Sequence, residues 1–285
     1  MRNIKTTTII KEAKRLLIEA SFNLPCDIIE AVKSAAKKEI SERAKKILEL
    51  TLENAKIAKK QKLPLCQDCG LVYIDLDIGP DICIEDSGSL NSLLNQAVAD
   101  IYTSNYLRKS IVSDPLYERK NTSGNTPAII STSFTSSPGL YIKIYLKGGG
   151  SENCSYLYML NPSTGEDEII NLVLDVVKKN VTKCCPPVIV GIGVGGTSSE
   201  VVKLARTASF RNLEIRNPDK RYRQLEKKIL NAINETGIGP QGLGGKTTAL
   251  VCNIEYAPCH MASFPLAVFM GCHSTRRANS KISPP

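Results

Sequence analysis

The sequence predicts a mixed α/β protein, in which an N-terminal helical block is followed by a mixed sheet flanked by helices. Residues 5–60 carry apolar side chains at helical spacing, whereas the rest alternates short β-type runs with amphipathic segments. A chain of 285 residues with 42% hydrophobic content can bury a substantial core. We expect one domain over residues 1–285, with a helical part at 1–62 and an α/β part at 63–278.

Three helices are expected in the N-terminal part. The first presents one apolar face, formed by Ile10, Ala13, Leu17 and Ala20. Pro25 can open the second helix, because the N–H that proline lacks is unsatisfied in a first helical turn anyway. Ser41 is a suitable N-cap for the third helix, since its hydroxyl can accept a backbone N–H of the first turn.

The remaining elements follow from periodicity and from apolar runs. Strands are expected at 71–78, 140–147, 188–194, 248–254 and 266–270. Helices are expected at 91–108, 166–180, 198–211 and 220–234. The residues from Ala278 onward carry no such pattern and read as a frayed end.

Composition narrows the range of partners. The formal net charge is +9, but many lysines fall on expected helices and aromatic residues are only 5%, so we expect no nucleic-acid partner. No apolar run approaches the roughly 20 residues of a membrane-spanning helix, and the first residues lack a signal-peptide core. We therefore expect no membrane association and a cytoplasmic location. A basic protein would also attract an acidic substrate such as a dicarboxylate.

The chain has ten cysteines, and the absence of a signal peptide favours reduced thiols over disulfides. We expect Cys26, Cys83, Cys154 and Cys252 to be buried as small hydrophobic residues.

Three other cysteine-bearing turns lie at 66–70, 184–187 and 271–276, each beside a β-rich run. Three thiolates from distant loops can hold an iron–sulfur cluster and leave one iron without a protein ligand. Such an iron can act as a Lewis acid in adding or removing water from a small hydroxy acid.

Other interpretations of these turns remain open. Cys66 and Cys69 could form half of a zinc site, but the only other close pair is Cys184 and Cys185, which are adjacent and sterically awkward as two ligands of one zinc ion. They could also form a redox pair.

The two histidines, His260 and His273, lie in loops that we expect to be next to the third cysteine turn. A lone histidine is nevertheless more often structural than functional.

Two glycine-rich loops suggest nucleotide binding. Gly191–Gly196 contains the GxGxxG pattern after a strand and before a helix, yet the acidic residue that should follow, Glu214, has no clear second strand before it. The loop 239–247 resembles a P-loop but has Pro240 where the first glycine is required. A nucleotide-binding protein that uses Gly191–Gly196 stays the alternative from a different functional class.

Eight motifs in order along the chain carry a family resemblance. They are CQDCG (66–70), YLRKS (106–110), NTPA (125–128), KGGGSEN (147–153), CPP (185–187), GIGVGGT (191–197), GIGPQGLGGKTT (237–248) and GCHSTRRA (271–278). Together they resemble the class I, iron–sulfur-dependent fumarate hydratases and L-tartrate dehydratases, and specifically the α subunit of the two-subunit forms. Two positions depart from the family pattern: Cys69 stands where threonine is usual, and Arg277 where histidine is usual.

The resemblance implies a [4Fe–4S] cluster with one open iron, held by Cys66, Cys185 and Cys272. Cys185 is preferred to Cys184 because the family's cysteine directly precedes the two prolines.

The resemblance also implies the residues that handle the substrate. Those matching its binding pocket are Gln67, Arg108, Gly149 and Gln241. For proton transfer the candidates are Asp68 and His260, since the pKa of histidine starts near neutrality, and Arg108 would stabilise the charge that develops on the substrate carboxylate.

The activity implied is that of a hydro-lyase that hydrates fumarate to L-malate, a reaction of the tricarboxylic acid cycle. The alternative is an L-tartrate dehydratase α subunit, which converts tartrate to oxaloacetate. In this family the base that removes the α-proton comes from a smaller β subunit, so we expect this chain to hold half of an active site and to act within an α2β2 hetero-oligomer.

Overall fold

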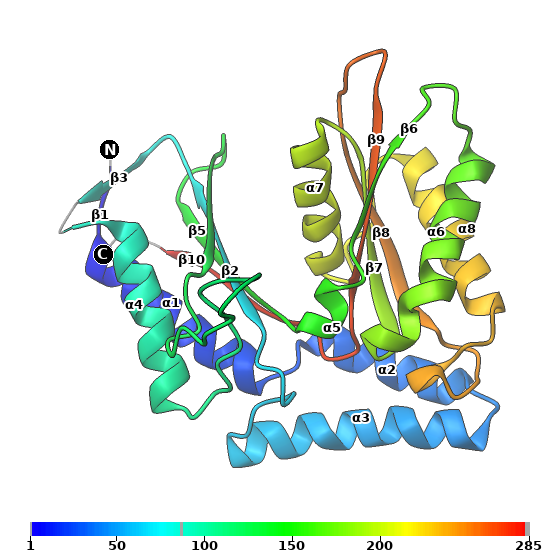
Figure 1. The fold of residues 1–285 in the computed structure, drawn as a ribbon, viewed down its shortest axis with the longest axis horizontal. Coiled ribbons are helices and arrows are strands. Elements are labelled where there is room, and N and C mark those ends of the chain that lie inside the picture. Colours follow the sequence, from blue (N-terminus) through cyan, green and yellow to red (C-terminus); the bar gives the residue numbers. More distant parts are fainter. Residues whose placement is uncertain (1, 86–87, 283–285) are drawn as a thin grey trace. The chain divides into compact units, whose positions relative to one another are not determined.

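The computed structural model describes residues 2–85 and 88–282 (Figure 1). Their contacts separate the chain into two units, each with its own sheet and hydrophobic core. The first unit comprises Met1–Pro25, Ala55–Gly149 and Arg276–Pro285, and the second comprises Cys26–Asn54 and Gly150–Thr275. Helices and mixed sheets occur in both, which confirms the predicted α/β class. A single domain over the whole chain stays a prediction.

The first unit is built on a four-stranded sheet in the order β10-β5-β2-β4. Its strands are β2 (Leu71–Ile78), β4 (Ile129–Phe134), β5 (Leu140–Lys147) and β10 (Arg276–Ile282). β5 is antiparallel to both β2 and β10, whereas β2 and β4 are parallel. Successive side chains of β5 point to opposite faces, and Leu140, Ile142 and Ile144 are fully buried.

Two helices cover this sheet: α1 (Thr6–Phe22) and α4 (Leu90–Ser104). The apolar face expected for the first helix is buried in α1 and packs in the same core as the inner face of β2. A smaller parallel pair, β1 (Arg2–Lys5) and β3 (Ile82–Glu85), belongs to the same unit. The sequence signals did not predict either of these short strands.

The second unit is built on another four-stranded sheet, in the order β6-β9-β7-β8. Its strands are β6 (Tyr156–Leu160), β7 (Val188–Gly195), β8 (Ala249–Ala257) and β9 (Phe264–Gly271). β7 and β8 are parallel, and β9 is antiparallel to β7 and to β6. Every residue of β7 is buried, as expected for a strand covered on both faces.

Helices lie on both faces of this sheet (Figure 1). One face is covered by α7 (Ser198–Phe210), and the other by α6 (Glu166–Asn180) and α8 (Lys220–Glu235). The glycines of β7 bring α7 close to the sheet. A Cβ on Gly191 would lie 2.2 Å from the backbone oxygen of Ala205, and one on Gly193 would lie 2.1 Å from that of Val201.

The remaining helices are α2, α3 and the short α5. α2 spans Cys26–Lys38 and begins directly after Pro25, as predicted. α3 spans Glu42–Gln61, and the Ser41 hydroxyl accepts the Ala44 N–H at 3.4 Å, which confirms the expected cap. α5 (Gly149–Glu152) is a single turn after β5.

Most other elements agree with the sequence prediction to within a few residues, but two expectations are wrong. The frayed end expected from Ala278 onward is wrong for 278–282, because 276–282 pairs with 140–146 of β5 and Ala278 and Ile282 are buried. The rest of that expectation, 283–285, lies outside the described residues. The helix expected at 91–108 ends at Ser104, because Tyr106 adopts a left-handed φ of 54°.

The cysteine expectations hold in part. Cys154 and Cys252 are buried as predicted, whereas Cys26 and Cys83 are exposed. Cys26 is the first residue of α2, and Cys83 points outward from the two-stranded sheet, so neither faces a core. None of the helices formed by residues 2–85 and 88–282 is both long and apolar enough to cross a membrane.

Candidate active site

In the first unit, the Cys66 turn and the glycine loop after β5 lie at the same edge of the sheet. Leu71, the first residue of β2, pairs with Lys147, the last residue of β5. This register brings 66–70, which precedes β2, beside 148–149, which follows β5. Gly70 has a φ of +83°, and a Cβ there would lie 2.7 Å from the Lys147 backbone, so the close approach needs glycine.

Asp68 joins these two loops. One of its carboxylate oxygens, Oδ2, accepts the Gly149 N–H at 2.6 Å, and the other, Oδ1, accepts the Gly70 N–H at 3.0 Å. A Cβ on Gly148 would lie 3.0 Å from Oδ2. Two of the predicted site residues, Asp68 and Gly149, are therefore in direct contact, and the carboxylate is oriented by backbone donors on both sides.

The Arg108 segment is held against the same turn. The Arg108 backbone N–H donates to the Cys69 sulfur at 3.2 Å. The Asn125 side chain, which is fully buried, donates to the Gly70 carbonyl at 3.0 Å and accepts the Ser110 N–H at 2.8 Å. The side chain of Arg108 itself is exposed. The YLRKS and NTPA motifs thus meet at the CQDCG turn.

Tyr102, from the last turns of α4, completes this arrangement. Its hydroxyl donates to the carbonyls of Cys69 and Gly70, at 3.0 and 3.1 Å. Burial raises the pKa of Tyr102 well above its ordinary value, so the hydroxyl keeps the proton that it donates. The sequence analysis identified neither Tyr102 nor Asn125. Asn125 lies inside a quoted motif and could have been found, whereas nothing local marks Tyr102.

The two cysteines of the CQDCG turn differ. Cys69 is 2% exposed, and burial raises the pKa of its thiol, which favours the protonated form over a metal-binding thiolate. Cys66 is half-buried, and its thiol lies 3.4 Å from Oε1 of Gln67, the neighbouring candidate residue. A zinc site or redox pair that used both thiols is therefore disfavoured, and Cys66 is the more available ligand.

In the second unit, the other two cysteine turns meet at one edge of the sheet. Ile189 of β7 pairs with Gly271 of β9, so the turn before β7 and the turn after β9 lie side by side. The backbone N–H of His273 donates to the Cys185 carbonyl at 3.4 Å. Cys185 is exposed and Cys272 is half-buried, with its sulfur 3.2 Å from the Ser274 hydroxyl.

Gln241 lies beside the Cys185 turn. It belongs to a short 3-10 helix, η2 (Pro240–Gly242), and has a left-handed φ of 54°. Its backbone N–H and its side-chain amide both donate to the Pro186 carbonyl, at 2.8 and 3.3 Å. The predicted residues Cys185, Cys272 and Gln241 are therefore neighbouring parts of one loop cluster.

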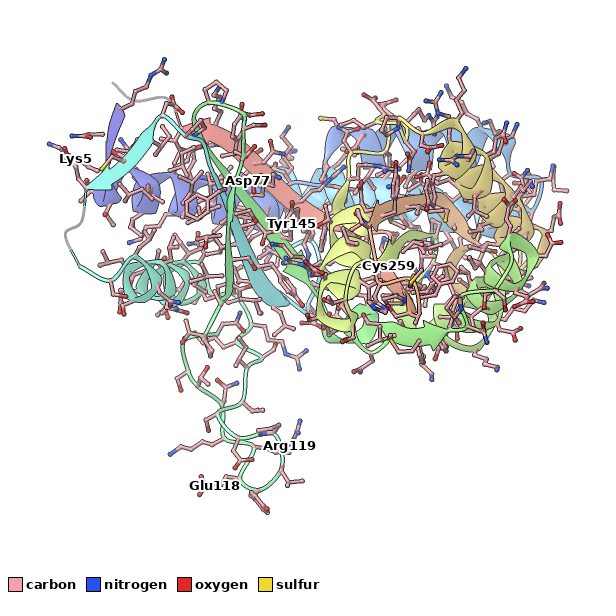
Figure 2. The ribbon with its side chains drawn as sticks, turned by 90° about the horizontal axis from the view of Figure 1, so that it is seen from above. Lys5, Asp77, Glu118, Arg119, Tyr145 and Cys259 are labelled. Atoms are coloured by element: carbon pink, nitrogen blue, oxygen red, sulfur yellow. The ribbon has the colours of Figure 1, made fainter. Side chains whose placement is uncertain are left out.

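His260 lies elsewhere in the same unit. It follows β8 in the loop before β9, next to Cys259, which Figure 2 labels. β7 runs from Ile189 beside Gly271 to Gly195 beside Ala257, a length of about 20 Å at the usual rise per residue. The expectation that His260 lies next to the Cys272 turn is thus wrong within this unit, because the strand between them, β9, runs from one edge of the sheet to the other. The His260 ring is exposed and its Nδ1 accepts the Ala262 N–H at 3.1 Å.

His273 does lie in the Cys272 turn. Burial lowers the pKa of its imidazole to about 4, so the ring is neutral near pH 7. Its Nδ1 is buried and finds no hydrogen-bond partner within 2–85 and 88–282. A buried ring nitrogen without a partner beside a candidate ligand is consistent with a turn that encloses a further group.

The candidate ligands Cys66, Cys185 and Cys272 are of the side-chain type that holds iron–sulfur clusters. No three His, Cys, Asp or Glu side chains in the described ranges form a group that could hold a metal ion. Cys66 belongs to the first unit, and Cys185 and Cys272 belong to the second. All three are thiols on loops at sheet edges and at least partly exposed, and thiolates are the ligands that such clusters take.

The structure accounts for the Gly191–Gly196 loop without a nucleotide. Gly191 and Gly193 allow α7 to pack closely, as described above. The first turn of α7 already has a capping box: the Thr197 hydroxyl accepts the Glu200 N–H, and the Glu200 carboxylate accepts the Thr197 N–H. A carboxylate therefore occupies the position where a phosphate-binding helix would offer its N–H groups.

Fold and site together define an α/β enzyme with three cysteine-bearing turns at sheet edges and a carboxylate held by a glycine loop. The family model described as fumarate hydratase (fumerase) matches residues 10–281. The chain therefore belongs to the fumarate hydratase family, which is a family of hydro-lyases, as the motifs predicted.

Two relatives illustrate the likeness. The chain is 40% identical over 271 residues to the "Putative L(+)-tartrate dehydratase subunit alpha" of Methanocaldococcus jannaschii, covering 94% of this chain and 95% of that protein. It is 29% identical over 259 residues to the L(+)-tartrate dehydratase subunit alpha of Escherichia coli K12, covering 90% and 85%.

Proposed function

We propose that this chain is the α subunit of an iron–sulfur hydro-lyase that reversibly hydrates and dehydrates a small dicarboxylic acid, with fumarate and L-malate as the first candidate pair. The observation that carries the proposal is the arrangement around Asp68. This carboxylate is held at one sheet edge by Gly70 and Gly149, and the Arg108 segment is hydrogen-bonded to the same turn. This arrangement supports Asp68 as the proton-transfer group and Arg108 as a group that binds a substrate carboxylate.

The proposed cofactor is a [4Fe–4S] cluster with one open iron. Cys66, Cys185 and Cys272 would hold it, and when bound it would supply Lewis-acid chemistry at the hydroxyl that leaves or enters. The protonated, buried Cys69 and the exposed Cys259 are not proposed as ligands.

The chain's own residues have three tasks. Arg108, exposed and able to form two parallel hydrogen bonds, binds a substrate carboxylate. The glycine loop at Gly149, together with Gln67 and Gln241, completes the polar lining that orients the substrate. Asp68 takes a proton from water in the hydration direction and returns it to the leaving hydroxyl in the dehydration direction.

His260 stays a candidate from sequence for the proton donor, but Asp68 is now better supported. The imidazole lies at the opposite edge of its sheet from Cys185 and Cys272, whereas Asp68 is two residues from Cys66. General acid–base catalysis requires the catalytic group to lie within hydrogen-bond reach of the substrate. The hydrogen bond from the Gly149 N–H and the nearness of Cys66 in sequence support Asp68 for this role.

A smaller β subunit is the proposed partner. Both relatives described above are named as α subunits, which supports a protein that acts with a second chain. The base that removes the α-proton is proposed to come from that chain, in an α2β2 assembly. A cytoplasmic location is part of the same proposal.

L-Tartrate dehydration to oxaloacetate is the second candidate, and the names of the relatives favour it. L-Malate and L-tartrate differ by one hydroxyl group. An enzyme rejects an analogue that lacks a hydroxyl strongly only when its own buried polar groups are left unpaired. The choice therefore depends on a few polar contacts.

The deciding experiment is an anaerobic assay of this chain with its β subunit. The complex is expected to show the visible absorption of an iron–sulfur cluster, and to consume either fumarate or tartrate with kcat/KM at least a hundredfold above the other. The single chain is expected to be inactive. A complex without cluster absorption and without turnover of either acid would contradict the proposal, as would full activity of the single chain.

A further inference from the structure

Arg276, the first residue of β10, is a deeply buried cation without a partner. The residue is 2% exposed, and Nε of its guanidinium is buried with no hydrogen-bond partner. No hydrogen bond or ion pair of this side chain is found anywhere within 2–85 and 88–282. Arginine cannot lose its proton in a protein, so the charge remains.

A second buried arginine shows what is missing. Arg211, in the second unit, has a side chain that is 10% exposed, and it forms ion pairs with Glu226 and, at 3.0 Å, with Glu255. It also donates to Asn253 Oδ1 at 2.9 Å. The two terminal nitrogens of Arg211 are thus paired with carboxylates, although its Nε, like that of Arg276, has no hydrogen-bond partner in the described residues. No carboxylate of residues 2–85 and 88–282 forms an ion pair with Arg276.

The surroundings of Arg276 are those of the candidate site. In the sheet it pairs with Leu146, which in turn pairs with Val72 of β2, so it lies at the edge that carries the Cys66 turn and the glycine loop. Burial raises the pKa values of Cys69 and Tyr102, and the positive charge of Arg276 partly opposes both rises. The positive charge of Arg276 therefore acts electrostatically on Cys69, in the turn that contains Asp68.

A buried charge is strongly unfavourable unless it is paired and hydrogen-bonded. No carboxylate in the described part of the chain forms an ion pair with the Arg276 guanidinium, although the charge of Asp68 acts on the same turn. A bound anion would supply the direct partner that Arg276 lacks among these residues. We infer that Arg276 binds an anion at this sheet edge, either a carboxylate of the substrate or the negatively charged cluster. The identity of the anion rests on the proposed function, whereas the existence of the anion site does not.

A guanidinium can bind either a substrate carboxylate or an iron–sulfur cluster. Its fork of N–H donors matches a carboxylate with two parallel hydrogen bonds. Hydrogen bonds from protein donors to the sulfurs of a cluster stabilise its more negative, reduced form and so raise its reduction potential. The two sources predict different measurable effects, and one set of variants separates them.

The first measurement is thermal unfolding of the full-length, cluster-free chain. Arg276→Met removes the charge and keeps an unbranched apolar side chain, so the melting temperature is expected to equal or exceed that of the unsubstituted protein. The matched variant Arg211→Met leaves Glu226 buried without its cation, so its melting temperature is expected to fall. Arg119→Met, on the exposed loop tip that Figure 2 labels, is the surface control.

The second measurement adds malonate, an unreactive dicarboxylate, and compares it with chloride at equal ionic strength. If a carboxylate is the anion, malonate raises the melting temperature of the unsubstituted chain and of Arg119→Met, and this rise is lost in Arg276→Met. Arg276→Lys, which keeps the charge but not the fork, is expected to retain only part of the rise.

The third measurement is the reduction potential of the reconstituted cluster in the complex with the β subunit. If the cluster is the anion, Arg276→Met shifts this potential downward and leaves the malonate effect unchanged. The inference is overturned if Arg276→Met destabilises the cluster-free chain as much as Arg211→Met does, or if neither malonate binding nor the potential responds to it. If Arg276→Met abolishes the malonate effect but the unsubstituted protein never acquires a cluster, this inference is upheld and the proposed function is refuted.

Discussion

The two units of this protein hold their cysteine turns by different means. In the first unit the Cys66 turn is fixed by its own Asp68, which accepts the Gly149 N–H, and by the buried side chains of Tyr102 and Asn125 from distant parts of the chain. In the second unit the Cys185 and Cys272 turns are set side by side by the register of β7 and β9, with backbone hydrogen bonds between loops. Side-chain support can be removed by one substitution, whereas strand register cannot.

This difference suggests that point changes away from the thiols will affect the first unit more than the second. The proposed ligands are the exception, since all three thiols would contribute equally to one cluster. Substitution of the proposed ligands should therefore affect the cluster equally from either unit, whereas substitution of other residues should affect only the unit that contains them.

The largest effect is expected from Cys185→Ser or Cys272→Ser. A serine hydroxyl is a poor iron ligand, so cluster absorption and hydro-lyase activity of the complex should fall to background. The control is Cys259→Ser, an exposed cysteine at the other edge of the same sheet, which should leave both unchanged. Equal loss in Cys259→Ser, or full cluster content in Cys272→Ser, would refute the ligand assignment.

The next effect is expected from Asn125→Ala. It leaves the Ser110 N–H without its partner and the Gly70 carbonyl with only the Tyr102 hydroxyl, which for a fully buried side chain should lower the unfolding free energy by about 1–3 kcal/mol. Because the Arg108 segment keeps only the bond from its N–H to the Cys69 sulfur as a connection to the Cys66 turn, kcat/KM should fall by about tenfold or more. The measurements are denaturant unfolding and steady-state kinetics.

Asn121→Ala is the matched control for that variant. Asn121 is exposed; its side chain donates to the Lys109 carbonyl at 2.9 Å and accepts the Ser123 N–H at 2.7 Å. Because water can replace both of these surface bonds, the loss should change stability by less than about 0.5 kcal/mol. If Asn125→Ala behaves like Asn121→Ala, the idea that side chains fix the Cys66 turn is wrong.

The sequence could predict those helices and strands whose residues show a local hydrophobic pattern. β2 and β5 were predicted to the residue because their alternation is local and strong. β10 was missed because its inward positions include Arg276 and Ser280, and only pairing with β5 makes it a strand. The position of His260 likewise depends on strand register, which no local pattern encodes.

The same contrast applies to the site. The cysteine turns and Asp68 were identified from motifs, and Asp68 and Gly149 do meet. Tyr102 could not be identified as a site residue, because a tyrosine near a helix end carries no signal of burial. Arg276 lies inside the GCHSTRRA motif, but nothing in the local sequence marks it as buried. Their roles arise from which segments the fold brings to one sheet edge.

Tyr102→Phe should give an intermediate effect with a distinctive pH dependence. Removing the hydroxyl takes away the donor to the Cys69 carbonyl and one of the two donors to the Gly70 carbonyl, which should lower the unfolding free energy by about 1–3 kcal/mol at pH 7. Burial raises the pKa of Tyr102 above its ordinary value of 10, so the unfolded chain loses this proton first as the pH rises. The hydroxyl's contribution is therefore complete below pH 10 and declines above it, by up to about 1.4 kcal/mol per pH unit.

The measurement is the unfolding free energy of both proteins between pH 7 and pH 11. The difference between them should shrink above pH 10, since the variant has no proton to lose at this position. A difference that stays constant up to pH 11 would mean that Tyr102 does not remain protonated in the folded protein, and its role as a donor to the Cys66 turn would have to be abandoned.

The smallest effect is expected from Thr197→Ala, in the second unit. The change removes the N-cap of α7 and should lower the unfolding free energy by about 1 kcal/mol, while Thr197→Ser, which keeps the hydroxyl, should be close to neutral. Activity of the complex should not change, because Thr197 follows Gly195 at the edge of the sheet opposite to Cys185 and Cys272. If activity falls by more than the loss of folded protein explains, the edge of the sheet that carries Thr197 takes part in the reaction. The assignment of the reaction to the edge that carries Cys185 and Cys272 would then be wrong.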